Sequence, residues 1–221
     1  PVLATHDLGE LSLAVDGAYS VILTAERPAG YAGDWWPLGN GATYVMVRQI
    51  AYDWTKEVDG RFAIERLDTP APRPLPDAAQ IENNLRAIAG WAGNVTRFSQ
   101  QWVMRYRTKG LVNKVALQDL TSYGGVASQQ YIEGMFELAP GEALIYETEI
   151  PKECRYWNVQ LTDMLWGVID WPNRQTSLNG HSGLIGKDGI FRAVISAQDP
   201  GVPNWLDTAG LRSGAILGRW R

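Results

Sequence analysis

The sequence has little of what several large protein classes depend on. Its 221 residues include one cysteine and two histidines, which excludes an internal disulfide and disfavours a dedicated zinc site. No apolar run approaches the roughly 20 residues that a membrane-spanning helix needs, so no membrane partner is expected. Basic residues do not outnumber acidic ones, 20 against 24. They gather in no single segment, which disfavours a nucleic-acid partner.

What remains is the composition of a globular protein, with 45% hydrophobic and 20% charged residues. The length suffices for one hydrophobic core without disulfides or metals, and we expect a single β-rich domain over residues 1–221. The lone cysteine, Cys154, and the lack of a charged-then-apolar leader favour a cytoplasmic protein. A secreted or periplasmic protein whose leader had been removed could also begin at Pro1.

Motifs for common chemistries are also missing. Residues 183–187, Gly-Leu-Ile-Gly-Lys, lack the first glycine and the hydroxyl residue of a phosphate-binding loop. Residues 39–41 lack the third glycine of a dinucleotide loop, and no Gly-x-Ser-x-Gly nucleophile elbow occurs. The sequence therefore predicts no cofactor and no metal.

Three Asp-Gly pairs indicate hairpins, because both residue types tolerate the positive φ angles of tight turns. The pair at residues 16–17 separates two alternating arms, residues 11–15 and 19–23. The pair at residues 59–60 is expected to join strands over residues 44–52 and 61–67. The third pair, at residues 188–189, comes directly before a strand predicted over residues 190–197. Four more strands are expected over residues 131–138, 143–150, 155–163 and 214–220.

Residues 77–109 break this pattern, because apolar residues recur there every three or four positions and predict one amphipathic helix. Asp77 is expected to cap it with Gln80 as its partner, and Gly110 suits its end. Its apolar face should lie across a sheet, with a polar face that includes Arg105 in water. One helix among hairpin-connected strands predicts a mainly β fold, an antiparallel β-sandwich or jelly-roll-like architecture.

The strand predicted over residues 155–163 has one polar side. Strand alternation places Tyr156, Asn158 and Gln160 on the face opposite its apolar residues. Amide side chains both donate and accept hydrogen bonds, which suits recognition of a hydroxyl- or amide-bearing small molecule. A solvated strand surface, or a satisfied buried network, is the structural alternative.

The turn-rich segment of residues 199–210 contains two prolines and is predicted to be an ordered loop. Asn204, Trp205 and Asp207 combine an aromatic platform with polar side chains, a common way to hold a planar or sugar-like ligand. Alternatively, the two polar residues cap turns and the Trp plugs the end of the sandwich. If both segments bind ligand, this loop and the polar strand side should be neighbouring walls of one cavity.

Two further charged groups are candidates for the site. His181 lies in a predicted loop, where an imidazole can act as general acid or base near neutral pH. Its candidate carboxylate partners are Asp170, Asp199 and Asp207. Arg155 could clamp an anionic group, with an ion pair to Glu147 or Glu149 as the structural alternative.

Residues 154–161 and 199–210 resemble the C-terminal region of bacterial proteins catalogued as domain of unknown function 1214. Residues 34–38, 45–49 and 136–144 resemble strands of the same family, so the resemblance covers about residues 34–220 and is weak before residue 34. The family has no settled reaction, and its members are longer at the N-terminus, which implies a missing N-terminal segment or a partner chain. Where the family usually has His after the segment matching residues 208–210, this sequence has Leu211. That departure favours a ligand-holding role for the loop over a catalytic one.

Two functions stay open, and whether the protein is an enzyme stays open with them. The first is a β-sandwich domain that binds a polar small molecule, serves in assembly, or both. Its ten Trp residues favour a homo-oligomer, because oligomer contacts recruit aromatic residues. The second is an acid/base hydrolase or lyase acting on a polar, carbohydrate-like small molecule through His181 and an Asp.

Overall fold

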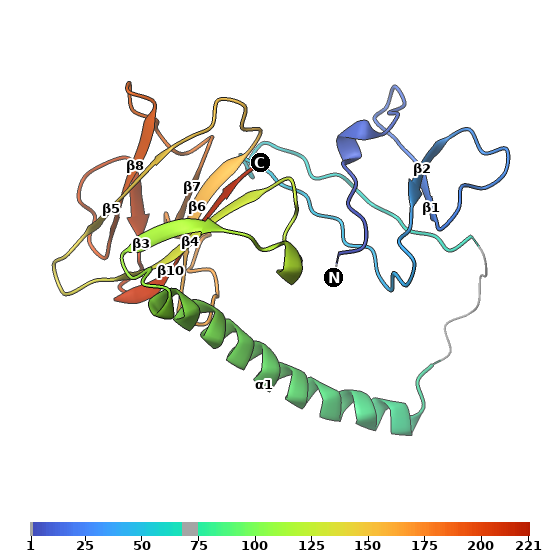
Figure 1. Ribbon diagram of the computed structural model, residues 1–221, viewed down its shortest axis with the longest axis horizontal. Helices are drawn as coiled ribbons and strands as arrows, with labels where there is room; N and C mark the ends of the chain where they lie inside the picture. Colours follow the sequence, from blue (N-terminus) through green and yellow to red (C-terminus); the bar gives the residue numbers. More distant parts are fainter. Residues whose placement is uncertain (1, 68–74) are drawn as a thin grey trace. The chain divides into compact units, whose positions relative to one another are not determined.

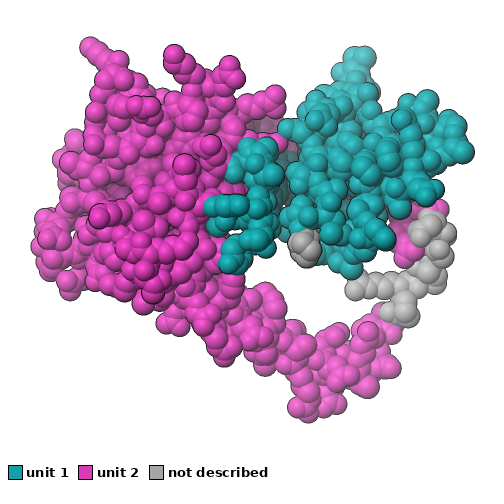
Figure 2. Space-filling view, in the orientation of Figure 1, with its two compact units in different colours: residues 1–49, 119–129 teal, residues 50–118, 130–221 magenta. Residues whose placement is uncertain are grey.

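The computed structural model describes residues 2–67 and 75–221. The chain forms two compact units, one made of Pro1–Gln49 and Asp119–Gln129 and the other of Ile50–Gln118 and Gln130–Arg221 (Figure 2). The single domain expected from the sequence stays a prediction. No helix in the described ranges is both long enough and apolar enough to cross a membrane.

The second unit is built on two β-sheets (Figure 1). In spatial order, the five-stranded sheet contains β3 (Lys114–Gln118), β4 (Gln130–Glu137), β10 (Ser213–Trp220), β6 (Trp157–Thr162) and β7 (Ser177–Asn179). The three-stranded sheet contains β5 (Leu144–Glu149), β8 (Ile190–Ser196) and β9 (Trp205–Asp207). All pairings in these sheets are antiparallel except that of β8 with β9. The predicted mainly β fold is confirmed.

The core of the sandwich lies between these two sheets. It joins Val159 and Leu161 of β6 to Phe191 and Ile195 of β8, all four fully buried. Because side chains alternate along a strand, the apolar half of β6 faces the core and its polar half faces away. Five of the strands predicted from alternation, those over residues 131–138, 143–150, 155–163, 190–197 and 214–220, are therefore confirmed to within two residues.

The predicted helix is α1 (Ala78–Thr108). Its N-cap is as expected, because the backbone N–H of Gln80 donates to the Asp77 carboxylate over 2.7 Å. Its packing differs from the prediction, since only its last two turns are buried, through Trp102, Val103 and Tyr106. Figure 1 shows α1 meeting the five-stranded sheet at its C-terminal end and extending away from it. Burial of the last turns is enough to anchor the helix, and the rest of its apolar face stays exposed.

The first unit contains β1 (Val21–Thr24) and β2 (Asp34–Pro37), with the short 3-10 helices η1 (Leu8–Glu10) and η2 (Thr121–Tyr123). β1 pairs with β2 in parallel, so the hairpin predicted around residues 16–17 is wrong. A tight turn does form there, because Gly17 takes a φ of 80° and its N–H donates to the carbonyl of Ala14. The arms form no ladder, since Leu13 and Val15 are exposed and a two-stranded hairpin that buries no face is barely stable in water.

The hairpin predicted for residues 44–52 and 61–67 is also wrong, because neither range contains a strand. Instead the chain makes a short turn over residues 53–57, in which the N–H groups of Lys56 and Glu57 donate to the carbonyl of Asp53. Local side-chain capping competes with strand pairing in such a segment. This turn belongs to the second unit and shapes the candidate site.

Candidate functional site

The face of the five-stranded sheet that points away from the core is rich in polar side chains. Asn158 projects from this face of β6, as the sequence predicted, and lies directly opposite Asn179 of β7 and Arg219 of β10. Directly opposite residues in antiparallel strands have Cβ atoms about 4.5–5.5 Å apart. Asn179, Asn158 and Arg219 therefore form one polar row across three strands, which we call the amide row. Gln160, half-buried, lies in the next row opposite Ser177.

Asn158 is the unusual member of the amide row. Its side chain is 8% exposed, and its Oδ1 atom is buried without a hydrogen-bond partner in the described part of the chain. A buried carbonyl oxygen left without a donor costs about 1–3 kcal/mol, and nearly all such groups in folded proteins find one. This oxygen therefore marks a place where a further hydrogen-bond donor would be stabilising.

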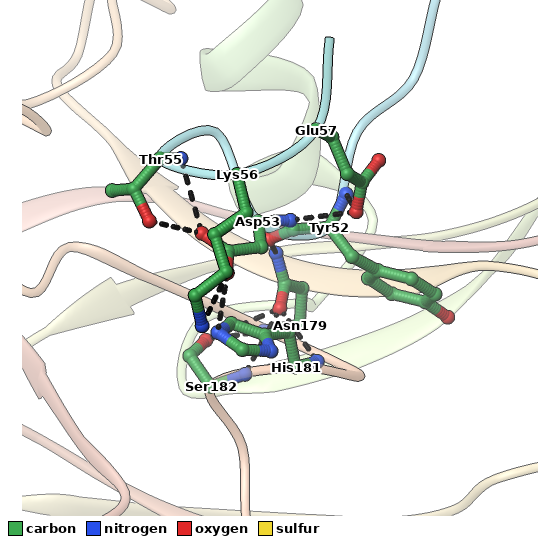
Figure 3. Close-up of polar contacts among 8 residues, drawn as sticks. All are labelled: Tyr52, Asp53, Thr55, Lys56, Glu57, Asn179, His181 and Ser182. Atoms are coloured by element: carbon green, nitrogen blue, oxygen red, sulfur yellow. Dashed lines mark hydrogen bonds and ion pairs between the residues drawn. The ribbon is translucent and has the colours of Figure 1, made fainter.

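Asn179 connects the amide row to the loop that follows β7 (Figure 3). Its Nδ2 donates to the carbonyl of Tyr52 over 3.0 Å. Its Oδ1 accepts from the backbone N–H groups of His181 at 2.8 Å and Ser182 at 3.1 Å. One amide thus fixes both the turn at residues 52–57 and the backbone that carries the imidazole.

Tyr52 holds that turn against β6. Its hydroxyl accepts a hydrogen bond from the N–H of Trp157 over 3.1 Å, and its ring lies 5.0 Å from the ring of Tyr156. Gly180 permits this approach, because a Cβ atom at that position would come within 2.7 Å of the Tyr52 ring. Burial raises the pKa of both phenols, so they stay neutral donors at physiological pH.

The turn at residues 53–57 is closed by its own side chains. The Glu57 carboxylate accepts from the N–H groups of Tyr52 and Asp53 at 3.0 and 2.9 Å. The Asp53 carboxylate accepts from the N–H of Thr55 over 3.0 Å and from its hydroxyl over 2.6 Å. These Thr55 bonds, with Lys56 at 3.3 Å, lower the pKa of Asp53 to about 2. Asp53 is therefore ionised throughout the physiological range.

His181 meets this ionised carboxylate. Its Nε2 atom lies 3.5 Å from Oδ2 of Asp53, the same oxygen that Lys56 contacts (Figure 3). The imidazole is half-exposed, with 52% of its side chain accessible. A fixed carboxylate at one ring nitrogen orients the ring and leaves the other nitrogen, Nδ1, to exchange a proton. Sequence reasoning missed Asp53, because it placed the neighbouring residues in a strand. The sequence signal that could have indicated this turn is the Asp-x-Thr spacing of Asp53 and Thr55, in which the Asp side chain caps its own turn.

An exposed aromatic pair adjoins Asp53. The indole rings of Trp54 and Trp171 meet edge to face with their centroids 4.6 Å apart, and they are 61% and 48% exposed. Sequence reasoning did not single out either residue. Exposed Trp rings beside polar groups offer an apolar surface to one side of a ligand.

Asn204 and Trp205, two loop residues predicted to bind ligand, hydrogen-bond to the backbone of other segments. Nδ2 of Asn204 donates to the carbonyls of Leu184 at 2.6 Å and Arg192 at 2.8 Å, and its Oδ1 accepts from the N–H of Leu184. Nε1 of Trp205 donates to the carbonyl of Ser196 over 3.1 Å. These hydrogen bonds connect the start of β9 to the backbone of Leu184 and of β8.

Asp207 is likewise occupied, and its carboxylate is almost completely buried. It accepts from Nη1 of Arg174 over 2.8 Å and from the N–H of Ala209 over 2.7 Å. Asp170 also faces Arg174, at 3.7 Å. The carboxylate that contacts His181 is therefore that of Asp53 and not one of the three Asp residues considered from the sequence.

The two predicted walls do not form one cavity. Asn158 and Gln160 project from the outer face of the five-stranded sheet, whereas Asp207 belongs to the three-stranded sheet beyond the core and Asn204 directly precedes that strand. Strand alternation was read correctly, but it cannot say which loops lie on which side of the sandwich.

Arg155 lies exposed just before β6. Glu147, one of its two suggested partners, is bound by Arg192 at 2.5 Å.

Among the residues that the structure describes, no group of three or more His, Cys, Asp or Glu side chains could hold a metal ion.

Comparison with known proteins places the fold. No protein-family model and no curated protein matches the chain. The chain is similar to the crystal structure of an uncharacterized protein from Burkholderia cenocepacia, with 30% identity and a TM-score of 0.82 over 97% of this chain. The chain spans 59% of that protein's length. A protein from Vibrio parahaemolyticus is 20% identical over 45% of this chain and 29% of its own, and its TM-score of 0.35 is too low to inform the fold.

Proposed function

We propose that the second unit binds a polar small molecule at the amide row, next to the Tyr52–Glu57 turn. The observation that carries this proposal is the buried Oδ1 of Asn158, which has no hydrogen-bond partner among the residues that the structure describes. A sheet face that only met water would leave this oxygen solvated, and a finished internal network would give it a donor. The resemblance to domain of unknown function 1214, a bacterial family without a settled reaction, is compatible with this role.

The chemistry of the ligand follows from the neighbouring groups. The ligand should donate an N–H or O–H to Asn158 and accept hydrogen bonds from Arg219, its neighbour in the amide row. Tyr156 lies two residues before Asn158, on the same side of the strand, and its ring contacts the ring of Tyr52. These two rings favour a compact ligand with some apolar surface. Hydroxy acids, sugar acids and small amides combine these features.

The test is a thermal-shift screen of hexoses, sugar acids and small amides, followed by calorimetric titration of every hit. Asn158→Ala should weaken binding about tenfold or more, because the ligand donor loses its buried acceptor. Asn83→Ala is the matched control, an amide removed from an exposed position on α1. Equal affinity in wild type and both variants would refute the proposal.

A second function is favoured by one specific observation, the contact of His181 with the ionised Asp53. The alternative is an acid/base hydrolase or lyase in which Asp53 orients the imidazole and Nδ1 moves the proton. The exposed Trp54–Trp171 pair would then hold the apolar side of a polar, carbohydrate-like substrate.

This alternative is tested with chromogenic esters and glycosides. His181→Gln should abolish turnover, and Asp53→Asn should reduce it about a hundredfold, in the range that general acid/base catalysis contributes. His6→Gln, in the first unit, is the control and should leave turnover unchanged. Identical rates in all four proteins would exclude the alternative.

We further propose that the protein is cytoplasmic, because it has a single cysteine. We propose that it is a homo-oligomer, because oligomer contacts recruit aromatic residues and the chain has ten Trp residues.

A further inference from the structure

The first six turns of α1 carry an apolar stripe that the other described residues of the second unit do not cover. Six large apolar side chains between residues 81 and 98 are 40–66% exposed. They are Ile81, Leu85, Ile88, Trp91, Val95 and Phe98. Single exposed apolar residues are ordinary, but six on one helix form a contiguous patch of the kind that marks an interaction surface. We call these six residues the α1 stripe.

The spacing of the stripe identifies the kind of partner. Ile81, Leu85, Ile88, Ala92 and Val95 follow one another at steps of four, three, four and three residues. This is the 3.5-residue period of a coiled-coil seam, which packs against another helix carrying the same period. Within the described residues, α1 is the one helix longer than three residues. We propose that the occupant is α1 of a second copy of this chain, in a two-fold symmetric dimer.

The size of the stripe fits a helix pair. Six side chains of this size, each about half exposed, leave roughly 500–700 Å² of apolar surface. A specific interface buries about 800 Å² on each partner. The stripe with its flanking small residues therefore approaches the area that a stable dimer needs, whereas a small-molecule ligand would leave most of it uncovered.

Charge and anchoring also suit pairing with an identical helix. An ion pair near the stripe, between Arg86 and Glu82 at 2.7 Å, joins two residues of the same helix. Trp91 and Phe98 flank the seam, and Glu82, the charged residue that also borders it, is already paired with Arg86. The C-terminal turns are fixed to β4 through Glu133, which accepts from Arg105 and Tyr106. The sandwich thus presents the stripe on a helix that is held at one end.

The test is the mass of the full chain in solution by light scattering, at 10 to 200 µM protein. A single chain has a mass of 24.5 kDa, and we expect twice that mass at the upper concentration. Ile88→Glu with Val95→Glu should give the monomer mass. Asn83→Glu, on the opposite side of the helix, should leave the dimer intact. Circular dichroism confirms that each variant keeps its helix, and a milder pair, Ile88→Gln with Val95→Gln, replaces the first if it unfolds.

Three results would overturn the dimer. The first is a wild-type monomer at 200 µM, which would mean that a different polypeptide or no partner covers the stripe. The second is a dimer that survives both stripe variants and therefore uses another surface. The third is a wild-type monomer that cosediments with phosphatidylglycerol vesicles through the stripe, which would make it a membrane-surface helix.

Discussion

Glu133 and Glu137 project from the same strand, β4, and each accepts a hydrogen bond from an α1 arginine over 2.7 Å. They differ in burial. The Glu133 side chain is 3% exposed, and Tyr106 also donates to it over 2.7 Å, whereas Glu137 and Arg107 are both nearly half exposed. The sequence predicted that Arg105 faces water. Instead it pairs with the buried Glu133 and lies over the Trp102 ring. The environment of each residue, and not the pairing itself, decides what an ion pair contributes.

Glu133→Gln should therefore lower the free energy of unfolding by about 3 kcal/mol, because it leaves the Arg105 charge buried without its counter-ion. Glu137→Gln is the matched control and should cost less than about 1 kcal/mol, since water screens its pair. Urea unfolding of the three proteins measures both values. Equal losses in the two variants would contradict the assignment of Glu133 to the buried anchor of α1.

A pH effect follows from Asp53. Its pKa in the folded chain is about 2, below its ordinary value of 3.8, because Thr55 and Lys56 favour the ionised form. A depressed folded pKa stabilises the fold above the ordinary pKa, and that contribution is lost as pH falls through the folded pKa. The stability difference between wild type and Asp53→Asn should therefore be constant above about pH 5 and shrink between pH 4 and 2. Denaturant unfolding at a series of pH values measures this, and a difference that grows on acidification would contradict it.

Residue roles were predictable where strand alternation fixes them. Asn158 and Gln160 lie on the polar side of β6 as expected, because a strand has only two faces. The partner of His181 was not predictable, because Asp53 is 128 positions away and joins it through the tertiary contacts of Asn179 and Tyr52. Asp207 caps a local turn, and Asn204 joins two backbone segments, so residue types typical of binding loops also have structural uses.

At the scale of elements, burial separates the predictions that were right from those that were wrong. The strands that line the core formed where alternation placed them. Residues 11–15 and 44–47 also alternate or run apolar, yet they bury little surface and form no strand. An apolar pattern indicates a strand only when a second layer covers one of its faces. The sequence shows the pattern but not the covering layer.

Two glycines in α1 give an element-scale test with a defined sign. A Cβ atom at Gly90 or Gly93 would meet nothing within 4 Å, and Ala favours a helix over Gly by about 1 kcal/mol. Gly90→Ala and Gly93→Ala should each raise helicity and stabilise α1, as measured by circular dichroism during thermal unfolding.

The opposing control is Gly134→Ala in β4, where a Cβ atom would lie only 1.9 Å from the carbonyl oxygen of Lys114. Overlap with backbone cannot be relieved by a rotamer change, so this variant should be destabilised. Stabilisation by Gly134→Ala, or lost helicity in the α1 variants, would contradict the described packing.

At the scale of the whole molecule, the chain combines the polar amide row, which we propose to bind a ligand, and an apolar helix stripe within one unit. The amide row lies on the outer face of the five-stranded sheet, and the stripe lies on the part of α1 that extends beyond it. The similarity to the Burkholderia cenocepacia protein covers 97% of this chain, so the fold is shared by a protein of greater length. The proposed ligand site and the proposed dimer are independent, because neither uses residues of the other.

The central claim is that Asn158 receives its missing hydrogen bond from a bound molecule. The most direct measurement is a crystal structure of the full chain grown with a hit from the ligand screen. We predict a ligand N–H or O–H within hydrogen-bond distance of Asn158 Oδ1, with Arg219 donating to the same molecule. An ordered water alone at this oxygen, with the ligand bound elsewhere, would contradict the account.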